Sequence, residues 1–471
     1  MSRLQGAPHR HRQRRRLLLA VLVLLVLAAL LTGCGWGGLA ALMGWVAHEA
    51  WFADHLFYRP DQDYGYLFPP EVRSLPARLQ ADGLLQLTGP LAATEETLLL
   101  AIRVRATLFG RFFDPQVRIG DDRQDFERGV HGLRYLNLSG QQVALMAGHL
   151  RLRGRFCRLA PQATLYAMAN PDYHQSRLLV LAAHADDAEL AAFGLYSQAP
   201  DVTLVTLTRG EVEAGFFRRL GLSGAAAARL KGRLRGWDSQ AIPLWGGVPQ
   251  SRCLQLGYFC LQLSAMAAEP DRPFGSRESG EHDIRPLRAH NPLPLPGDRD
   301  GQPTWHNLVA DLRAVLVHYR PDVVVMPHPE LDPHSDHQAA SRALLEACQG
   351  LAQPPEQLLL YANHLQDNDR WPMGPAGGGS ALPPVLAALP ADRLWSPLLS
   401  GAQQLDKAMA LAMQHDLQTP LPFRKRLRRI LQWLLAGRRW PRTGEDEFFR
   451  RAVRRHELFW VRPLDRRPPG P

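Results

Sequence analysis

Two short clusters of histidine and aspartate stand about 150 residues apart in the chain. The first reads His184-Ala185-Asp186-Asp187, followed by Ala188 and Glu189, and the second reads His334-Ser335-Asp336-His337. Imidazole and carboxylate groups are common zinc ligands, and the same groups serve as general acids and bases. The two clusters together therefore predict a catalytic zinc ion with spare groups for acid and base chemistry.

Three of these residues make a natural ligand set. Catalytic zinc commonly has three protein ligands and a water molecule in the fourth position. His184 and Asp187 are three residues apart on a predicted strand-to-helix turn, so both can face one point, and His337 is the expected third ligand. Two neutral imidazoles and one carboxylate leave the site positive, which lowers the pKa of bound water and polarises a carbonyl group.

The remaining cluster residues are candidates for the catalytic groups. A carboxylate beside the water, Asp186, suits a general base. His334 on the opposite side can stabilise an oxyanion or protonate the leaving group. We expect Asp336 to orient the His334 imidazole and to keep it charged.

The elements that must position these residues alternate along the chain. Each cluster follows an apolar run that reads as a buried strand, and strand patterns alternate with helical ones. Such alternation predicts an α/β fold with a Rossmann-like, mostly parallel sheet and helices on both faces, whose sites gather at the carboxyl ends of the strands. The predicted strands are 177–183, 202–207 and 322–326, and the predicted helices are 189–197 and 308–319.

The chain is long enough for more than one domain, and its composition changes along its length. It has 471 residues, of which 46% are hydrophobic and 21% charged. We expect a linker at 48–69, a small β-rich, sandwich-like accessory domain at 70–168 and the catalytic domain at 172–420. The β-rich assignment rests on short alternating runs at 84–88, 98–107, 116–119 and 150–159. This domain could bind glycan or serve only as a packing spacer.

The two ends of the chain are basic. The net charge is +10 and the pI is about 9.7, but the excess lies in a basic n-region at 1–16 and a basic amphipathic tail at 421–471. The tail either packs on the catalytic domain or lies on anionic lipid. A nucleic-acid partner is not expected, because no binding module accompanies the charge. The five cysteines do not form a disulfide framework.

An apolar stretch follows the basic n-region. Residues 17–47 predict a membrane anchor or signal segment, and a re-entrant hairpin is an alternative. Leu31-Thr32-Gly33-Cys34 resembles the bacterial lipobox, whose cysteine is lipidated after cleavage. The predicted location is the bacterial inner membrane, through a single-pass anchor or as a lipoprotein, with the catalytic domain facing the periplasm.

Candidate substrate contacts come from two places. Arg209 and Glu211 follow the strand at 202–207. The aperiodic stretch 268–304 reads as a binding loop or lid, or as a disordered segment. Its polar candidates, with the tryptophan directly after it, are Arg277, Arg285, Arg288 and Trp305.

Four motifs in order resemble the PIG-L/LmbE-like zinc-dependent N-acetylglucosaminyl de-N-acetylases. They are the first cluster at 184–189, Thr208-Arg209-Gly210-Glu211, the strand that begins with Arg320 and ends at Val324, and the second cluster at 334–337. The match covers roughly 176–345. Ser335 replaces the usual proline, and the stretch 230–257 lacks the family's usual charged pattern, which leaves the identity of the sugar open.

The resemblance implies roles for the cluster residues and an activity. His184, Asp187 and His337 would bind Zn²⁺, Asp186 would be the general base, and His334, supported by Asp336, would stabilise the tetrahedral intermediate. The predicted function is a membrane-anchored deacetylase that removes acetyl from a GlcNAc-type sugar of an envelope glycan or glycolipid, with lipopolysaccharide as the first candidate. The alternatives are another metal-dependent amidase or esterase, and a non-catalytic glycan-binding envelope protein.

Overall fold

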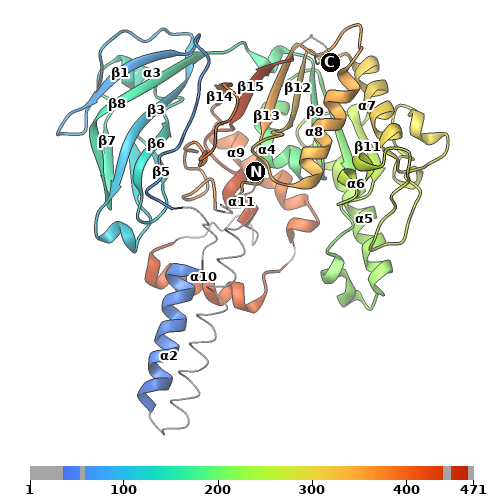
Figure 1. The fold of residues 1–471 in the computed structure, drawn as a ribbon, viewed down its shortest axis with the longest axis horizontal. Coiled ribbons are helices and arrows are strands. Elements are labelled where there is room, and N and C mark those ends of the chain that lie inside the picture. Colours follow the sequence, from blue (N-terminus) through green and yellow to red (C-terminus); the bar gives the residue numbers. More distant parts are fainter. Residues whose placement is uncertain are drawn as a thin grey trace.

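The computed structural model describes residues 35–53, 59–366, 368, 370–418, 420–438 and 447–464. These residues form three sheets, of five, three and seven strands, with helices around the largest (Figure 1). The prediction of a mixed α/β fold is confirmed.

The N-terminal part of the described chain is β-rich. Its five-stranded sheet has the order β2-β1-β8-β3-β6 and its three-stranded sheet the order β5-β4-β7, and neighbouring strands in both sheets pair antiparallel. The elements are β1 (Arg73–Leu79), β2 (Leu85–Leu87), β3 (Glu95–Ala106), β4 (Gln116–Ile119), β5 (Asp122–Asp125), β6 (His131–Asn137), α3 (Gln142–Met146), β7 (Leu152–Arg155) and β8 (Cys157–Ala169).

Strand β3 of the five-stranded sheet is buried on both faces from residue 97 to residue 102, whereas β1 alternates between buried and exposed residues. Successive residues of β3 point to opposite sides, as strand geometry requires. Leu100 and Ile102 enter a core shared with Val117 of the smaller sheet, whereas Leu99 and Ala101 enter the core of the catalytic region. A sandwich of two comparable sheets is not supported, because the second sheet has only three short strands.

The seven-stranded sheet carries the predicted clusters. Its order is β11-β10-β9-β12-β13-β15-β14. The first five strands are parallel, and β15 runs antiparallel to both of its neighbours, β13 and β14. The strands are β9 (Leu178–Ala182), β10 (Val202–Thr208), β11 (Cys253–Tyr258), β12 (Val323–Pro327), β13 (Gln357–Tyr361), β14 (Arg393–Trp395) and β15 (Phe459–Pro463).

Helices cover both faces of this sheet. Leu179 and Leu181 of β9 pack in one core with α6, α7 and α8, and Leu178 and Val180 pack in another with α4 and α9. A strand buried on both faces reads as an uninterrupted apolar run, which is why the sequence revealed β9 and β12. The helices are α4 (Asp187–Tyr196), α5 (Gly224–Ala241), α6 (Leu263–Ala268), α7 (Trp305–Tyr319), α8 (Ser335–Cys348) and α9 (Gly401–Met413).

The C-terminal segment belongs partly to the catalytic sheet. It forms α10 (Phe423–Ala436) and α11 (Glu447–Ala452), and then β15 inserts between β13 and β14. The basic helix α10 lies near α2 (Gly35–Ala47), as Figure 1 shows. Arg424 and Arg428 of α10 bind the buried Glu49 in the turn after α2.

The predicted membrane location is wrong. No helix among the described residues is long and apolar enough to cross a membrane. The described helix α2 leads into a short π-helix, His48–Phe52, that contains the ion-paired Glu49. Most of the predicted segment, residues 17–34 with the lipobox Cys34, and the n-region 1–16 lie outside the described residues.

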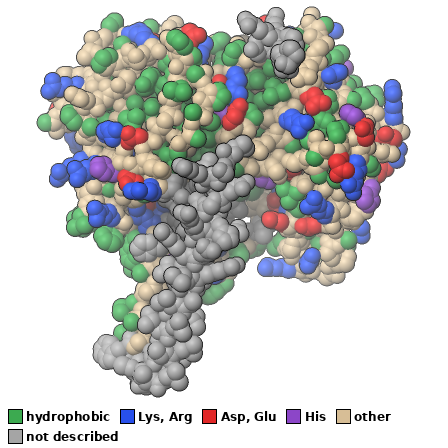
Figure 2. All heavy atoms as spheres, in the orientation of Figure 1, with side chains coloured by type: hydrophobic (Ala, Val, Ile, Leu, Met, Phe, Trp, Pro, Cys, Tyr) green, Lys and Arg blue, Asp and Glu red, His purple; other side chains and the backbone are tan. Residues whose placement is uncertain are grey.

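Charged side chains are mixed over the surface that Figure 2 draws. Lys and Arg side chains alternate there with Asp and Glu over both the β-rich and the catalytic region. On that face, the basic composition of the chain is not gathered into one patch.

Candidate active site

The two predicted clusters meet at one edge of the seven-stranded sheet. Strands β9 and β12 are parallel neighbours, so their carboxyl ends lie side by side. His184 follows β9, and Asp187 begins α4. His334 caps the N-terminus of α8, and His337 lies in the first turn of that helix.

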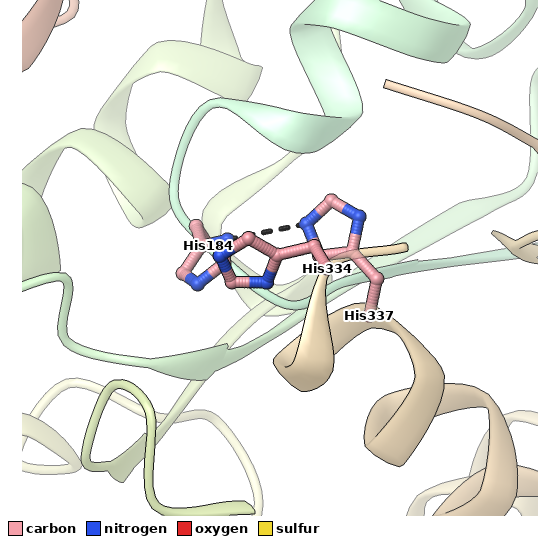
Figure 3. A group of neighbouring side chains, drawn as sticks. All are labelled: His184, His334 and His337. Atoms are coloured by element: carbon pink, nitrogen blue, oxygen red, sulfur yellow. Dashed lines mark hydrogen bonds between the residues drawn. The ribbon is translucent and has the colours of Figure 1, made fainter. Parts of the chain in front are cut away.

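The three predicted ligand atoms form a nearly equilateral triangle. His184 Nδ1 lies 3.3 Å from His337 Nε2 and 3.3 Å from Asp187 Oδ2, and the third side, from His337 Nε2 to Asp187 Oδ2, is 3.2 Å. Figure 3 shows the two imidazoles turned toward each other, with His334 beside them. Tetrahedral ligands about 2.0–2.1 Å from a zinc ion are separated by about 3.3 Å. These residues therefore fit a zinc ion.

The triangle also favours positive charge. Burial opposes a charge on His337, but the carboxylates of Asp187 and Asp332 outweigh it and raise the pKa of His337 to about 9. Burial likewise works against the Asp187 carboxylate, yet His337 and His184 hold the pKa of Asp187 well below its usual range. A protonated imidazole offsets the negative charge of these buried carboxylates, and a bound metal cation would offset the same charge.

Two other groups of side chains are close enough to hold an ion. His184, His334 and His337 form one, and His184, Cys260 and Asp336 form the other. In each group the ligand atoms lie within 4.8 Å of one another. The set with Asp187 has shorter separations and a carboxylate between two imidazoles, so it fits a tetrahedral ion better.

Side chains that the sequence analysis missed hold the triangle in place. Asp332 Oδ2 lies 2.8 Å from His337 Nδ1 and accepts the backbone N–H groups of Asn363 and His364. The Asn363 amide donates to Asp187 Oδ1 over 2.9 Å. Asn363 and His364 follow β13, which pairs with β12. The signal that could have revealed them is a short apolar run, 358–361, followed by polar residues.

Asp336 does not support His334 as predicted. Its Oδ2 accepts the N–H of Leu261 over 2.7 Å and lies 3.3 Å from His184 Nε2. The reason is that Asp336 and His334 are neighbours on the first turn of α8, where the backbone N–H of Asp336 donates to His334 Nδ1. Asp336 therefore orients the predicted ligand His184 instead.

His334 is not kept charged either. Burial lowers the pKa of His334, and the positive charges of His184 and His337 lower it further. Because Nδ1 accepts a hydrogen bond, the proton of the neutral ring is on Nε2. A neutral imidazole of this kind can donate a hydrogen bond to a developing oxyanion.

Asp186 is held by a buried arginine. Arg235 of α5 donates to Asp186 Oδ1 over 2.9 Å and to Asp416 Oδ2 over 2.7 Å. Burial works against the guanidinium charge, but the two carboxylates keep the pKa of Arg235 above its ordinary value. Gly210 makes room for this arginine, because a Cβ there would lie 2.1 Å from Arg235 Nε.

The predicted substrate residues fall into two groups. Arg209 and Arg288 are buried and hold the long loop in place: Arg209 donates to the carbonyl oxygens of Gly257 and Asp283, and Arg288 pairs with Asp311. Glu211 is also buried, with Oε2 accepting the N–H of Cys260, and burial raises its pKa.

The remaining candidates lie on or just after the loop. Arg285 is half-exposed and pairs with Asp283, and Arg277 is exposed. Trp305 is buried at the start of α7 and donates to Glu346. Substrate contact by any residue of either group stays a prediction.

A comparison with solved structures matched chains that include deacetylases. One is the N,N'-diacetylchitobiose deacetylase from Pyrococcus horikoshii with its inhibitor MPG: identity is 13%, 62% of this chain and 86% of that chain are covered, and the TM-score is 0.33. Another is the zinc-inhibited form of teicoplanin deacetylase Orf2, at 16% identity, with 61% and 98% covered and a TM-score of 0.32.

The same comparison includes a different chemistry. GalB, the 4-carboxy-2-hydroxymuconate hydratase from Pseudomonas putida KT2440, is 14% identical, with 62% of this chain and 98% of that chain covered and a TM-score of 0.30. No protein-family model matches the chain, and no curated protein matches it significantly. A fold hosts many activities, so the function must be argued from the site.

Proposed function

We propose that this protein is a zinc-dependent deacetylase that hydrolyses the N-acetyl group of a GlcNAc-type amino sugar and releases acetate. One observation carries the proposal: the donor atoms of His184, Asp187 and His337 form a triangle with sides of 3.2–3.3 Å. A candidate base, Asp186, directly precedes Asp187 in the chain, and the imidazole of His334 lies beside those of His184 and His337. This arrangement supplies the groups that hydrolysis of an amide requires.

His184, Asp187 and His337 would hold the zinc ion, which supplies a Lewis acid for the acetyl carbonyl and lowers the pKa of a water molecule. Asp186 takes a proton from the attacking water and delivers it to the departing sugar amine. The Nε2–H of His334 donates to the carbonyl oxygen as negative charge develops on it.

Arg235 fixes the position of the proposed base. Its guanidinium is shared between Asp186 and Asp416 and binds the Asp186 carboxylate through one oxygen. Lys231 binds the other oxygen of Asp416 over 2.8 Å. This buried chain of charges keeps one Asp186 oxygen engaged and leaves the other for the proton transfer.

The substrate is proposed as a class, an N-acetylated amino sugar. The motif resemblance supports the sugar amide. A glycolipid or lipopolysaccharide was predicted from the apolar N-terminal segment, and that argument has no support from the described helices. An amino sugar carried on an envelope glycan stays a candidate for the test below.

A substrate panel tests the proposal. The purified full chain, loaded with Zn²⁺, is given N-acetylglucosamine, N-acetylated oligosaccharides, a GlcNAc-bearing glycolipid and simple acyl esters, and released acetate is measured. We expect acetate from at least one amino-sugar amide, loss of turnover on chelation and recovery on adding Zn²⁺. Hydrolysis of esters alone would favour the esterase alternative, and tight glycan binding without turnover would favour a binding protein.

A further inference from the structure

The imidazole of His184 faces two groups of ligands at once. Its Nδ1 lies in the triangle with Asp187 and His337, and its Nε2 lies 3.3 Å from Asp336 Oδ2 on the other side. Cys260 completes this second group, because its Sγ, a carboxylate oxygen of Asp336 and a ring nitrogen of His184 lie within 4.8 Å of one another. The three residues come from the ends of β9 and β11 and from the first turn of α8.

Cys260 reaches this point through a fixed turn. It is buried, and its Sγ lies 3.1 Å from Thr208 Oγ1. Thr208 uses its own hydroxyl hydrogen on the carbonyl oxygen of Ala183, so the thiol is the donor to Thr208. The next residue, Leu261, has a φ of +58° and donates its N–H to Asp336, which ties the cysteine turn to the carboxylate.

One oxygen of Asp336 has no partner. The residue is fully buried, Oδ2 accepts two contacts, and Oδ1 accepts no hydrogen bond from any described residue. A buried carboxylate oxygen left unsatisfied is costly and uncommon in native proteins. A cation between Asp336 and the thiol would satisfy it.

We propose that His184, Cys260 and Asp336 form a second cation site, distinct from the triangle and selective for soft divalent ions such as Zn²⁺ or Cd²⁺. Thiolate sulfur selects such ions over Mg²⁺ or Ca²⁺, which prefer oxygen. Binding forms bonds from the ion to Sγ, to Nε2 and to a carboxylate oxygen. Two protons leave to solvent, one from the thiol and one from Nε2.

The second site would regulate the first, and this consequence rests on the proposed function. His184 would be shared between two positive ions, and Asp336 would no longer accept the Nε2–H that orients it. Loss of an orienting partner commonly weakens metal binding or activity about 10–100-fold. Excess Zn²⁺ or Cd²⁺ should therefore inhibit the enzyme.

A Cd²⁺ titration tests the site directly. The full chain loaded with one equivalent of Zn²⁺ is titrated with Cd²⁺, while the ultraviolet band of Cd²⁺–thiolate coordination, the bound metal and the rate of acetate release are recorded. The test variant is Cys260→Ser. The matched control is Cys348→Ser, which removes another buried thiol, in α8.

We expect the wild type and Cys348→Ser to bind a second equivalent with the thiolate band and to lose activity about 10–100-fold as it fills. Cys260→Ser should show no band, and its activity should be unaffected by excess ion. Absence of the band in the wild type, or its persistence in Cys260→Ser and Cys260→Ala, would overturn the proposal. The band and stoichiometry need no turnover, so they report on this site even if the proposed deacetylation fails.

Discussion

Two clusters of buried charged side chains, one in the β-rich region and one at the edge of the seven-stranded sheet, differ in how completely their charges are paired. In the β-rich cluster every nitrogen of Arg134 donates, to Glu127 and to backbone carbonyl oxygens. Tyr64 stacks under the guanidinium and donates to the same glutamate. One cation faces one carboxylate, and the cluster is complete by itself.

The cluster at the sheet edge is not complete. Three buried carboxylates, Asp187, Asp332 and Asp336, surround the imidazoles of His184 and His337. Even when both imidazoles are protonated, they offset only two of these three negative charges, and Asp336 Oδ1 accepts no hydrogen bond from any described residue. The comparison indicates that a buried ion pair with all its hydrogen bonds made has a structural role. An excess of buried carboxylates is typical of a site that binds cations.

The largest expected effect is a loss of kcat in a variant of the proposed base, Asp186, without loss of zinc. Asp186→Asn removes the proton acceptor but keeps the size of the side chain and its contact with Arg235. We expect kcat to fall about 10²–10⁴-fold, with the zinc content unchanged by elemental analysis. An unchanged kcat would remove Asp186 from the mechanism, and loss of zinc would make it a ligand.

The complete cluster should matter for stability alone. Glu127→Gln leaves the buried Arg134 without its carboxylate, which should lower the free energy of unfolding by about 3–5 kcal/mol, measured by denaturant titration. The affinity of the folded protein for zinc should not change. Asp61→Asn is the control, because the Asp61–Arg59 pair is solvent-exposed and should contribute nothing measurable. Equal losses in both variants would break the comparison.

A substitution in the cluster at the sheet edge should change the affinity for zinc, in contrast to Glu127→Gln. Asp332→Asn weakens the partner that orients His337, and we expect zinc affinity to fall about 10–100-fold, measured by competition with a chelator. Glu330→Gln is the control in the same loop, since Glu330 pairs with Arg462 outside the triangle. Zinc affinity equal to that of the wild type would mean that Asp332 only supports the loop.

The smallest expected effect is a pH dependence of stability at the contact between the two regions. His456 is buried, donates to the carbonyl oxygen of Ser139, and has its pKa lowered to about 4 by burial. The unfolded chain takes up this proton near pH 6.5, so the stabilisation is present above pH 6.5 and is lost as the pH falls toward 4.

We expect His456→Gln to flatten this loss, by about 1 kcal/mol at about pH 5.5 and by more at lower pH. The measurement is the free energy of unfolding of both proteins at several values between pH 4 and 7. Parallel curves for the two proteins would mean that other groups cause the acid sensitivity.

The sequence predicted the elements whose patterns are local. β9, α4, β10, α7 and β12 were found within a few residues of their bounds, because strands buried on both faces and amphipathic helices leave clear periodicities. The run 150–159 was predicted as one strand, yet the chain turns at Phe156, where φ is +61°, and forms β7 and β8. The short strand β15 lies in the segment 421–471, which the sequence analysis interpreted as a basic tail because of its charge. Its strand structure depends on pairing with β13 and β14, which are distant in the sequence.

The sequence predicted the two His/Asp clusters at the centre of the site, but not the residues that contact and orient them. Both clusters follow strands, so their meeting at one edge could be expected from the parallel fold. Asp332, Asn363 and Arg235 were missed because they act through neighbours that only the strand order and the packing of α5 bring together. The pairing of Asp336 with His184 in place of His334 depends on side-chain directions in one helical turn, which spacing alone does not resolve.

The measurement that tests the central claim most directly is the anomalous scattering of crystals of the zinc-loaded protein at the zinc absorption edge. With one equivalent of Zn²⁺, we predict one strong peak about 2.0–2.2 Å from His184 Nδ1, Asp187 Oδ2 and His337 Nε2, which is absent from crystals of Asp187→Ala. A zinc-loaded crystal with no peak at the triangle, or with a peak that survives in Asp187→Ala, would contradict the account.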